Sequence, residues 1–529
     1  MSTTHKHQRK SIGVIDIFAG PGGLGEGFSS FELPSGERPF EVAASAEMEK
    51  SAHETLSLRA FVRILQDLEG SRLPAAYLEY LRRVSAGELI KPEDYFADGP
   101  WGREWRRAAE RSLHLTLGND SDNETLYARV EAVKRGFCET ILIGGPPCQA
   151  YSLVGRARQA RVERFRTKGD PRHFLYRQYL QVLAALKPAV FILENVRGIL
   201  TSTVGGNEMF ADITRDLADP VAALSGSPGR ESGQYELLPV HVEHGEVRTA
   251  DLVANNPSRF VIRCERHGIA QARHRVIIMG VRRNFLRPGV AVIPGLPVID
   301  GELSIESALT GLPRLRSGLS RQNDDPLLWR DAIEHERKRL LRALRSRMSD
   351  VVERLEQMTP GFRLPRKSIR YDGGTSALAA QLRDPKQTFV LNHETRGHME
   401  SDLGRYMFCA AFAAARKRSP SSEDFPWQLA PDHYSWGTGA FADRFRVQVR
   451  TKPSSTVTSH LSKDGHAFIH WDPRQCRSLT VREAARLQSF PDDYLFVGNR
   501  TQQYVQVGNA VPPLVARQIA NVVWSVLNA

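Results

Sequence analysis

The stretch SIGVIDIFAGPGGLGEGF, residues 11–28, decides the fold that the sequence predicts. It begins with an apolar run typical of a buried strand and then passes through closely spaced glycines. Gly20, Gly22 and Gly25 match the spacing G-x-G-x-x-G between a strand and a helix, where missing side chains let the backbone approach an adenosine cofactor. Several nucleotide-type cofactors share this pattern, and a tight turn without any ligand would also account for it.

Segments typical of strands and helices alternate through the first third of the chain. After the opening stretch, the strand candidates are FEVAASAEM (40–48), TILIGG (140–145), AVFILEN (189–195) and VIIM (276–279). A helix is predicted over residues 174–187, where apolar residues recur at intervals of three and four before Pro188. Strands that alternate with helices predict an α/β protein with a Rossmann-like, doubly wound sheet.

The chain, at 529 residues, is too long for one ordinary core, and its character changes after Arg283. A Pro/Gly-rich link is followed there by a basic helical stretch, residues 331–358, with one face formed by Leu340, Leu344, Met348, Val351 and Leu355. Regular helical patterning returns near residue 476. We therefore expect a catalytic domain at 1–283 with a helical insertion at about 56–115, a second, smaller domain at 284–475, and a C-terminal segment at 476–529 that returns to the first domain.

The net charge and the number of cysteines limit the classes of protein to which this chain can belong. A net charge of +12 and a pI of about 9.6 favour a polyanionic partner such as nucleic acid. Five scattered cysteines without a CxxC pair argue against a disulfide framework and a structural zinc site. His393, His398 and Asp402 lie close in sequence, but no comparable fourth ligand accompanies them, so we expect no metal. The sequence has no run of 18 apolar residues, so we expect no membrane span and a cytoplasmic, nucleoid-associated location.

One cysteine stands in an unusual setting. In GGPPCQAYS, residues 144–152, Cys148 follows a strand end and two prolines, which stiffen the loop where the thiol projects. An ordinary thiol has a pKa of about 8.5, so some thiolate is available near neutral pH for nucleophilic attack. A buried structural thiol is the alternative, and it is our interpretation of the other four cysteines.

Charged residues close to strand ends are further candidates. Glu194, in VFILENVRG, leaves an apolar strand near the same sheet edge as Cys148 and could donate a proton, although a helix N-cap is an alternative role. Arg273 and Arg275, in QARHRVII, lie two apart on one side of an extended segment and suit an anion or a carbonyl; a solvated salt bridge is the alternative. Glu47 ends the second predicted strand, where it could accept hydrogen bonds from ribose hydroxyls.

Taken together and in this order, these motifs resemble those of the DNA (cytosine-5) methyltransferase family, in its bacterial type. DIFAGPGG resembles its first cofactor motif, GGPPCQAYS its nucleophile motif, ENVRG its acid motif and QARHR its arginine motif. RSLTVREAARLQSFPDDY and QVGNAVPP resemble its two closing motifs. The resemblance covers about residues 1–283 and 450–529, and the family's variable target-recognition domain falls between them.

The resemblance implies a class I S-adenosylmethionine-dependent methyltransferase that acts on C5 of a flipped cytosine in duplex DNA. Cys148 would attack C6, Glu194 would protonate N3, and Arg275, helped by Arg273, would hold O2. The implied cofactor-binding residues are Phe18, Gly20, Gly22, Gly23, Glu47, Met48, Leu175, Asn509, Ala510 and Val511. The implied DNA-binding residues are Gln149, Ser152, Thr456 and Thr458.

Several alternatives stay open at this stage. A tRNA cytosine-5 methyltransferase would use the same chemistry, but the long Arg- and Lys-rich segment at 284–475 favours DNA. A DNA-binding module with a vestigial catalytic half is another alternative, and the intact catalytic motifs argue against it. A nicotinamide dehydrogenase would share only the glycine loop. We expect a monomer on DNA that serves a restriction-modification or other defence system and works with a cognate protein of that system.

Overall fold

The computed structural model shows the expected α/β architecture. It describes residues 11–70, 72–147, 171–201, 203–204, 207–225, 234–240, 256–286, 295–431, 436 and 444–528. Within them, one sheet of eight strands has the order β3-β2-β1-β4-β5-β11-β8, with β9 paired to β11. The strands are β1 Ile12–Ile17, β2 Phe40–Glu47, β3 Ser112–His114, β4 Thr140–Gly144, β5 Val190–Val196, β8 Tyr235–Pro239, β9 Val261–Arg263 and β11 His274–Arg282. All five strand candidates from the sequence are therefore confirmed.

The sheet is mostly parallel, with one reversed strand. Strands β3, β2, β1, β4 and β5 run in the same direction, and β11 runs antiparallel to β5, β8 and β9. The strand order turns back between β1 and β4, because the chain builds outward from β1 on one side and from β4 on the other. Ligands of open α/β sheets bind outside the carboxyl ends of the strands at such a point.

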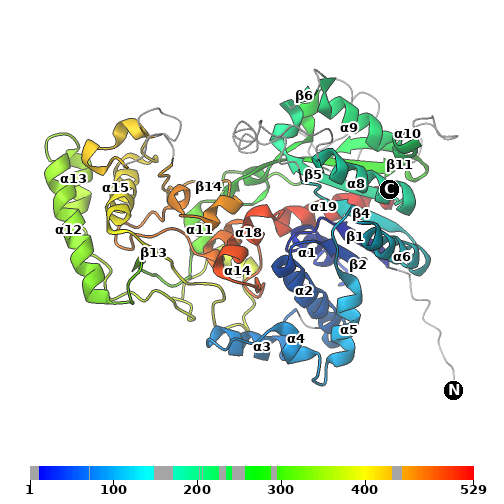
Figure 1. Ribbon diagram of the computed structural model, residues 1–529, viewed down its shortest axis with the longest axis horizontal. Coiled ribbons are helices and arrows are strands. Elements are labelled where there is room, and N and C mark those ends of the chain that lie inside the picture. The colour runs from blue at the N-terminus through cyan, green and yellow to red at the C-terminus, as the bar shows by residue number, and fades with distance from the viewer. Residues whose placement is uncertain are drawn as a thin grey trace.

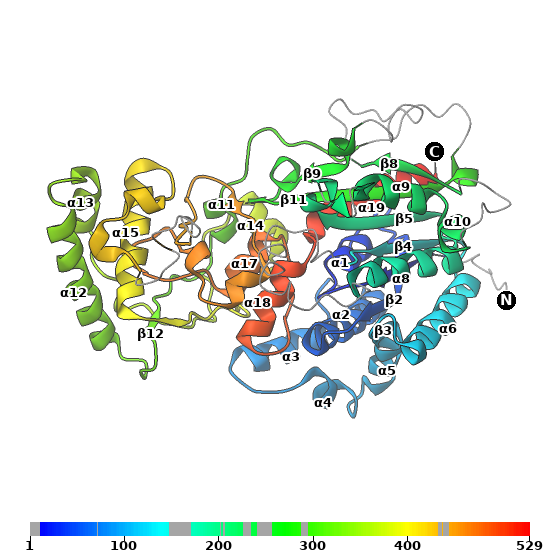
Figure 2. The same ribbon diagram turned by 45° about the horizontal axis from the view of Figure 1, so that its top comes forward.

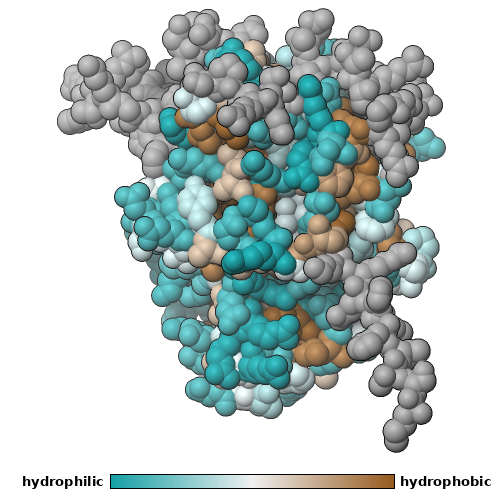
Figure 3. Space-filling model, turned by 90° about the vertical axis from the view of Figure 1, so that its right-hand side faces the viewer, coloured by the Kyte–Doolittle hydropathy of each residue, from teal (hydrophilic) through white to brown (hydrophobic). Residues whose placement is uncertain are grey.

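Helices cover both faces of the sheet (Figures 1 and 2). Alternation along β1 directs Val14 into a core with α1 (Gly23–Ser29) and α19 (Pro513–Leu527), and Ile15 into a core with α6 (Asp120–Gly136) and α8 (Pro171–Leu186). Helices α9 (Met209–Ala218) and α10 (Pro220–Ser225) extend the second layer. The described surface at this end of the molecule is mostly hydrophilic with separate hydrophobic areas (Figure 3).

The insertion between β2 and β3 is helical, as expected, but its first helix starts before residue 56. Its helices are α2 (Lys50–Glu69), α3 (Ala75–Ser85), α4 (Pro92–Phe96) and α5 (Gly102–Arg111). The N-terminal half of α2 packs beside β2 and β3, and α3 and α4 lie away from the sheet (Figure 1). The first and last helices of the insertion, α2 and α5, therefore lie against β2 and β3, and α3 and α4 form a separate layer.

The segment after β11 forms a second lobe, which extends from the middle of Figure 1 to its left. Its helices are α11 (Ile305–Leu309), α12 (Pro326–Leu344), α13 (Ser349–Glu356), α14 (Ala377–Leu382) and α15 (Glu400–Arg416), and short paired strands are β12 (Gly318–Leu319) with β13 (Gly397–His398). Two other short pairs join β10 (Gln271–Ala272) to β14 (Ser454–Ser455) and β6 (Thr203–Val204) to β7 (Asn207–Glu208). The domain boundaries predicted from composition stay a prediction.

The basic stretch 331–358 is helical but broken in two. Helix α12 ends at Leu344, where the carbonyl accepts the N–H groups of Arg347 and Met348, and α13 starts at Ser349. A single helix over 326–356 would be about 46 Å long, against about 25 Å for α15. The break folds the apolar side chains of both pieces, including Leu340 and Leu355, onto α15 in one core.

The last part of the chain joins the two lobes. Helices α17 (Val481–Leu487) and α18 (Arg500–Asn509) share a core with α11 and α14, whereas α19 packs on α1 under the sheet. Among described residues, only 500–527 is long and apolar enough to cross a membrane, and 61% of its most apolar window is buried inside the protein. Helices α18 and α19 therefore form part of the core.

Helices α1 and α19 approach so closely that the contact tolerates no side chain at Gly27. A Cβ added there would lie 2.3 Å from the Cβ of Ala516, so we expect Gly27→Ala to lower the free energy of unfolding by about 1–3 kcal/mol. Gly136→Ala is the matched control. It also replaces a glycine in a helix, but the added Cβ would meet nothing within 4 Å. Urea unfolding checks both variants, and equal effects would contradict the packing argument.

Candidate active site

The carboxyl ends of β1, β2 and β5 bring Phe18, Glu47 and Glu194, three of the predicted site residues, to the same end of the sheet. These strands are parallel, so their carboxyl ends lie on the same side. The loop after β1 contains the glycines, β2 ends in Glu47, and Glu194 lies near the end of β5. Cys148, Gln149 and Ser152 lie outside the described residues.

The glycine loop has a backbone that most residues could not adopt. Gly20 has φ 56° and Gly22 has φ 93°, both in the left-handed region where glycine is favoured. Phe18, just after β1, also has a positive φ of 56°, an uncommon conformation for an aromatic residue. Such conformations persist where the surroundings impose them, which supports a binding function for this turn.

Glu47 ties the end of β2 to the glycine loop. Its carboxylate accepts the N–H of Gly20 at 2.8 Å and the N–H of Glu49 at 2.8 Å. Burial raises the pKa of Glu47, although these backbone hydrogen bonds lower it. Each oxygen keeps a lone pair for a further donor, such as a ribose hydroxyl. Met48 is 60% exposed, and its carbonyl lies 3.0 Å from Nε2 of His114 at the end of β3.

The predicted residues from the C-terminal motif lie beside the glycine loop. A Cβ added to Gly23 would lie 2.1 Å from the carbonyl oxygen of Val511, so Gly23 is required for this close approach. Ala510 and Val511 are buried, and Asn509 is exposed at the end of α18. The structure therefore brings the glycine loop and the segment 509–511, which are both predicted to bind the cofactor, together. Leu175 is half-buried near the start of α8.

Glu194 and Arg275 form an ion pair across the β5–β11 ladder. Arg275 Nε lies 2.9 Å from Glu194 Oε1, and both side chains are only slightly exposed. A Cβ added to Gly145, directly after β4, would lie 2.8 Å from Glu194 Oε2. The carboxylate thus lies between the arginine and the start of the Gly-Pro-Pro-Cys segment. It can exchange a proton with a ligand there, and the guanidinium can bind a carbonyl oxygen.

Arg273 has a different setting from the expected one. It is 1% exposed, and its terminal nitrogens donate to the carbonyl oxygens of Val457 at 2.8 Å, Gly508 at 3.2 Å and Ala510 at 2.8 Å. Burial, reinforced by the nearby Arg275, lowers the pKa of Arg273 to about 9. Its hydrogen bonds connect backbone segments, so the geometry favours a positioning role over the expected direct help to Arg275.

The two threonines expected to meet phosphates also take part in this framework. Thr456 donates its hydroxyl to the carbonyl of Ala272 at 2.6 Å, and Thr458 directly precedes a short 3-10 helix at Ser459–Ser462. A Cβ added to Gly508 would lie 2.3 Å from the carbonyl carbon of Thr458. Because the Thr456 hydroxyl already donates its hydrogen to Ala272, it can only accept a hydrogen bond from another group.

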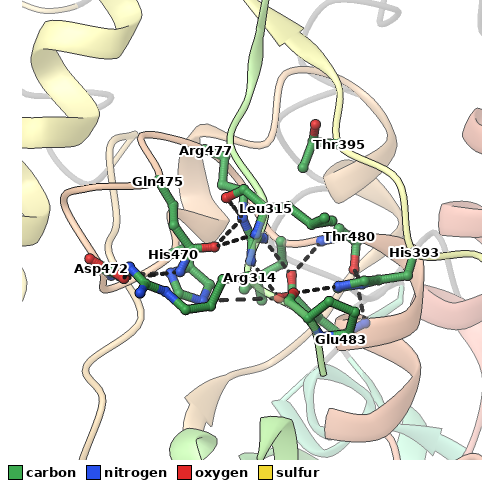
Figure 4. Close-up of polar contacts among 12 residues, drawn as sticks. Arg314, Leu315, His393, Thr395, His470, Asp472, Gln475, Arg477, Thr480 and Glu483 are labelled. Atoms are coloured by element: carbon green, nitrogen blue, oxygen red, sulfur yellow. Dashed lines mark hydrogen bonds and ion pairs between the residues drawn. The ribbon is translucent and has the colours of Figure 1, made fainter. Parts of the chain in front are cut away.

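A buried polar network joins the second lobe to the first closing motif (Figure 4). Arg477 donates to both oxygens of Glu483 at 2.6 Å, and Glu483 accepts the Thr480 N–H at 2.8 Å in a capping box. Burial would raise the pKa of Glu483, but Arg477 lowers it well below its usual range. No individual role was predicted for these residues from the sequence, although T-x-x-E before an apolar helix is a recognisable capping signal.

The His393, His398 and Asp402 group is part of the same framework. The ring nitrogens of His393 contact Thr480 Oγ1 and the Pro313 carbonyl, each at 2.9 Å, and burial lowers its pKa to about 4. Asp402 accepts a hydrogen bond from Arg405 at 2.7 Å. His398 Nε2 lies 3.4 Å from Ser478 Oγ. These contacts give the three residues structural functions.

The remaining cysteines agree with the structural interpretation in three of four cases. Cys264, Cys409 and Cys476 are buried, and burial raises the pKa of each thiol. Cys138 is exposed, so the expectation of a buried thiol was wrong there. It lies directly after Phe137, beyond the end of α6, and its thiol donates to the Ser11 carbonyl at 3.7 Å.

Asp16, four residues before Gly20, has an unusual setting that was not predicted from the sequence. It interrupts the apolar run of β1, is fully buried, and completes no side-chain hydrogen bond with a described residue. Burial raises the pKa of Asp16 to about 7, although Arg63 and the Gly25 backbone lower it. The sequence does contain a signal for this setting, because Asp16 is an acidic residue inside the apolar run SIGVIDIFAG.

The raised pKa of Asp16 predicts a pH-dependent stability. Between pH 4 and 7 the folded protein binds more protons at Asp16 than the unfolded chain, so its contribution to the free energy of unfolding falls as pH rises. Asp16→Asn removes this loss, and its stability relative to the unmodified protein should rise by about 2–4 kcal/mol from pH 5 to pH 8. Urea unfolding at both pH values tests this, with exposed Asp98→Asn as control; a pH-independent difference would contradict it.

Comparison with known proteins gives a consistent result. The family model described as C-5 cytosine-specific DNA methylase matches residues 129–219 and 258–525. The type II methyltransferase M.Bpa9945I of Bacillus paralicheniformis is 30% identical over an alignment covering 97% of this chain and 99% of that protein. The type II methyltransferase M.AgeI of Thalassovita gelatinovora is 28% identical over 72% of this chain and 82% of that protein.

A solved structure supports the fold. It is a crystal structure of an E. coli prophage protein described as a DNA modification methyltransferase. The superposition has a TM-score of 0.50 at 18% identity and covers 98% of this chain and 100% of that one. This similarity is evidence for the fold alone.

Proposed function

Since this chain belongs to the C-5 cytosine-specific DNA methylase family and methylates cytosine at C5 in DNA, we propose that S-adenosylmethionine is its methyl donor and that Cys148, Glu194 and Arg275 act on the base. The tRNA and vestigial alternatives are not favoured, because the matching family is one of DNA methylases. The observation that carries the proposal is the Glu194–Arg275 pair beside Gly145, at the start of the Pro-Pro-Cys segment.

The residues at the sheet edge fit an adenosyl group. The positive φ angles of Gly20 and Gly22 leave the turn open to close approach, and Glu47 has lone pairs for ribose hydroxyls. Phe18 and Met48 offer apolar surface for the adenine, and Asn509 offers an exposed amide. Leu175, Gly23, Ala510 and Val511 shape the remaining pocket. When bound, S-adenosylmethionine supplies an electrophilic methyl group on a sulfonium.

The chemistry on cytosine needs a nucleophile and a proton donor. C5 of cytosine is a poor nucleophile because the ring is aromatic and electron-poor. When the Cys148 thiolate adds to C6 and N3 gains a proton from Glu194, the ring becomes an enamine that is nucleophilic at C5. Arg275 orients the Glu194 carboxyl and can bind O2 of the ring. The base must leave the duplex to expose both faces.

DNA recognition and cellular role complete the proposal. The segment 284–475 would read the flanking bases, and Gln149, Ser152, Thr456 and Thr458 would lie along the backbone of duplex DNA. The relatives are named type II methyltransferases, which supports a role in restriction-modification beside a cognate nuclease. We propose a cytoplasmic monomer that uses neither a metal nor a membrane.

A mechanism-based trap tests the nucleophile. Duplex DNA with 5-fluorocytosine at the target cannot lose fluorine as a cation, so the cycle should stop with Cys148 bonded to C6. We expect an adduct that survives denaturing electrophoresis, requires S-adenosylmethionine and disappears in Cys148→Ser. Peptide mapping should place it within GGPPCQAYS. An adduct on exposed Cys138, or one that persists in Cys148→Ser, would refute the assignment.

The acid role of Glu194 predicts a selective kinetic defect. Glu194→Gln keeps the shape and can still contact Arg275, but the amide cannot transfer a proton to N3. The methylation rate should fall by about 10²–10⁴-fold, while the Kd for S-adenosylmethionine changes less than about threefold. Single-turnover kinetics and equilibrium dialysis measure the two quantities. Equal losses in both would make Glu194 a cofactor-binding or structural residue.

A further inference from the structure

The helical insertion α2–α5 shares its core with distant parts of the chain. Its cluster of buried side chains, which includes Phe61, Tyr77 and Trp105, also contains Phe389, Leu391 and Leu495. The first two come from the second lobe, and Leu495 follows the first closing motif. The insertion therefore packs between the two lobes rather than on the catalytic sheet alone.

Helix α2 reaches the helix that follows the glycine loop. Arg59, 2% exposed, donates to both carboxylate oxygens of Glu26 on α1, at 2.7 and 3.3 Å. Burial would raise the pKa of Glu26, but Arg59 and Arg63 lower it, so the pair stays charged. A Cβ added to Gly22 would lie 2.7 Å from Leu56 Cδ2, so α2 also borders the glycine loop directly.

The segment 491–495 lies between the insertion and the glycine loop. Arg59 Nη1 donates to Asp493 Oδ2 at 2.9 Å, and the buried Tyr77 of α3 donates its hydroxyl to the Asp493 carbonyl at 2.6 Å. The next residue, Tyr494, places its ring 4.5 Å from the Arg59 guanidinium and donates its hydroxyl to the carbonyl of Pro21. A continuous set of contacts thus runs from α3 to the glycine loop.

The same insertion helix contacts the other predicted cofactor segment. Thr55 donates to the side chain of Gln506 on α18 at 2.7 Å, and Gln506 donates to Ser51 at 3.1 Å. Helix α18 ends at Asn509, so α2 is bonded near both backbone segments that border the proposed pocket. Gly20, Gly22 and Gly23 of the glycine loop have no side chains, so contacts from outside these residues must hold their backbone in place.

We infer that the insertion positions the glycine loop for methyl-donor binding, and that Tyr77 is a positioning residue that acts on this loop through Asp493 and Tyr494. The inference rests on the proposed binding of S-adenosylmethionine at this loop. It gives a function to α3, which lies away from the sheet. Tyr77 touches no reacting group, so its loss should change binding of the donor and leave the chemical step intact.

Two tyrosines of α3 offer a matched comparison. Tyr77 donates to Asp493 in the connecting segment, whereas Tyr80, equally buried, donates to the Ile90 carbonyl inside the insertion at 3.0 Å. Tyr77→Phe and Tyr80→Phe each remove one hydroxyl and keep the ring. Both should lower the urea midpoint by similar amounts. Only Tyr77→Phe should raise the Kd for S-adenosylhomocysteine, by about three- to tenfold.

Further measurements separate positioning from general destabilisation. With S-adenosylmethionine saturating, the single-turnover rate of Tyr77→Phe should stay within about twofold of the unmodified enzyme. Tyr494→Phe should raise the Kd similarly, and the double variant should show less than the product of the two single effects, since both act through one segment. Equal Kd values for Tyr77→Phe and Tyr80→Phe, or multiplicative effects in the double variant, would overturn the inference. If the unmodified protein binds neither adenosyl compound, the proposed function fails instead.

Discussion

The close contact between the first and last helices of the chain determines the geometry of the site. Gly23 and Gly27 on α1 have no side chains, so Val511 and Ala516 approach the α1 backbone directly. This contact places the segment 509–511 beside the glycine loop. It also presents the Ala510 carbonyl to Arg273, which lies two residues before Arg275. A bulkier residue at Gly23 or Gly27 would therefore disturb both the proposed cofactor pocket and the segment that bears Arg275.

Buried arginines hold the remaining segments in one arrangement. Arg59, Arg273 and Arg477 are at most 2% exposed, and each donates to carboxylates or carbonyls of segments far away in sequence. A buried ion pair adds little net stability, because desolvation offsets the attraction, but loss of one partner leaves an uncompensated charge. Removal of one of these arginines would therefore leave buried acceptors of a distant segment without a donor. The first closing motif illustrates this, since Glu483 and Asp492 bind Arg477 and Arg486 rather than facing the proposed pocket.

The antiparallel direction of strand β11 explains how Glu194 and Arg275 meet. Its register pairs Ile277 with Glu194, so Arg275, two residues earlier, stands opposite Val196 and reaches the carboxylate along the ladder. If β11 were parallel to β5, its N-terminal end would lie at the opposite end of the strands. Because β11 is antiparallel, its N-terminal end lies beside the carboxyl ends of the parallel strands. Local charge pairing then orients both side chains before a base arrives.

Local signals predicted much of the fold and the positions of several site residues. The apolar runs of β1, β2, β4 and β5, the glycines at 20 and 22, and the strand-end placement of Glu47 and Glu194 follow from side-chain periodicity and backbone freedom, which depend on near neighbours. The division of residues 331–358 into α12 and α13 depends on packing against α15, which no local pattern encodes.

The roles of Arg273 and Tyr77 were beyond prediction from spacing for the same reason. Arg273 appeared to be a partner of Arg275, but its acceptors come from residues 457, 508 and 510. Tyr77 donates to Asp493, more than 400 positions away. Local periodicity and residue type were enough to predict the strands, the glycine turn and the chemical groups at the carboxyl end of the sheet. Which of those groups are bound by distant backbone depends on tertiary packing, because buried polar groups must be satisfied by whichever segments the packing brings to them.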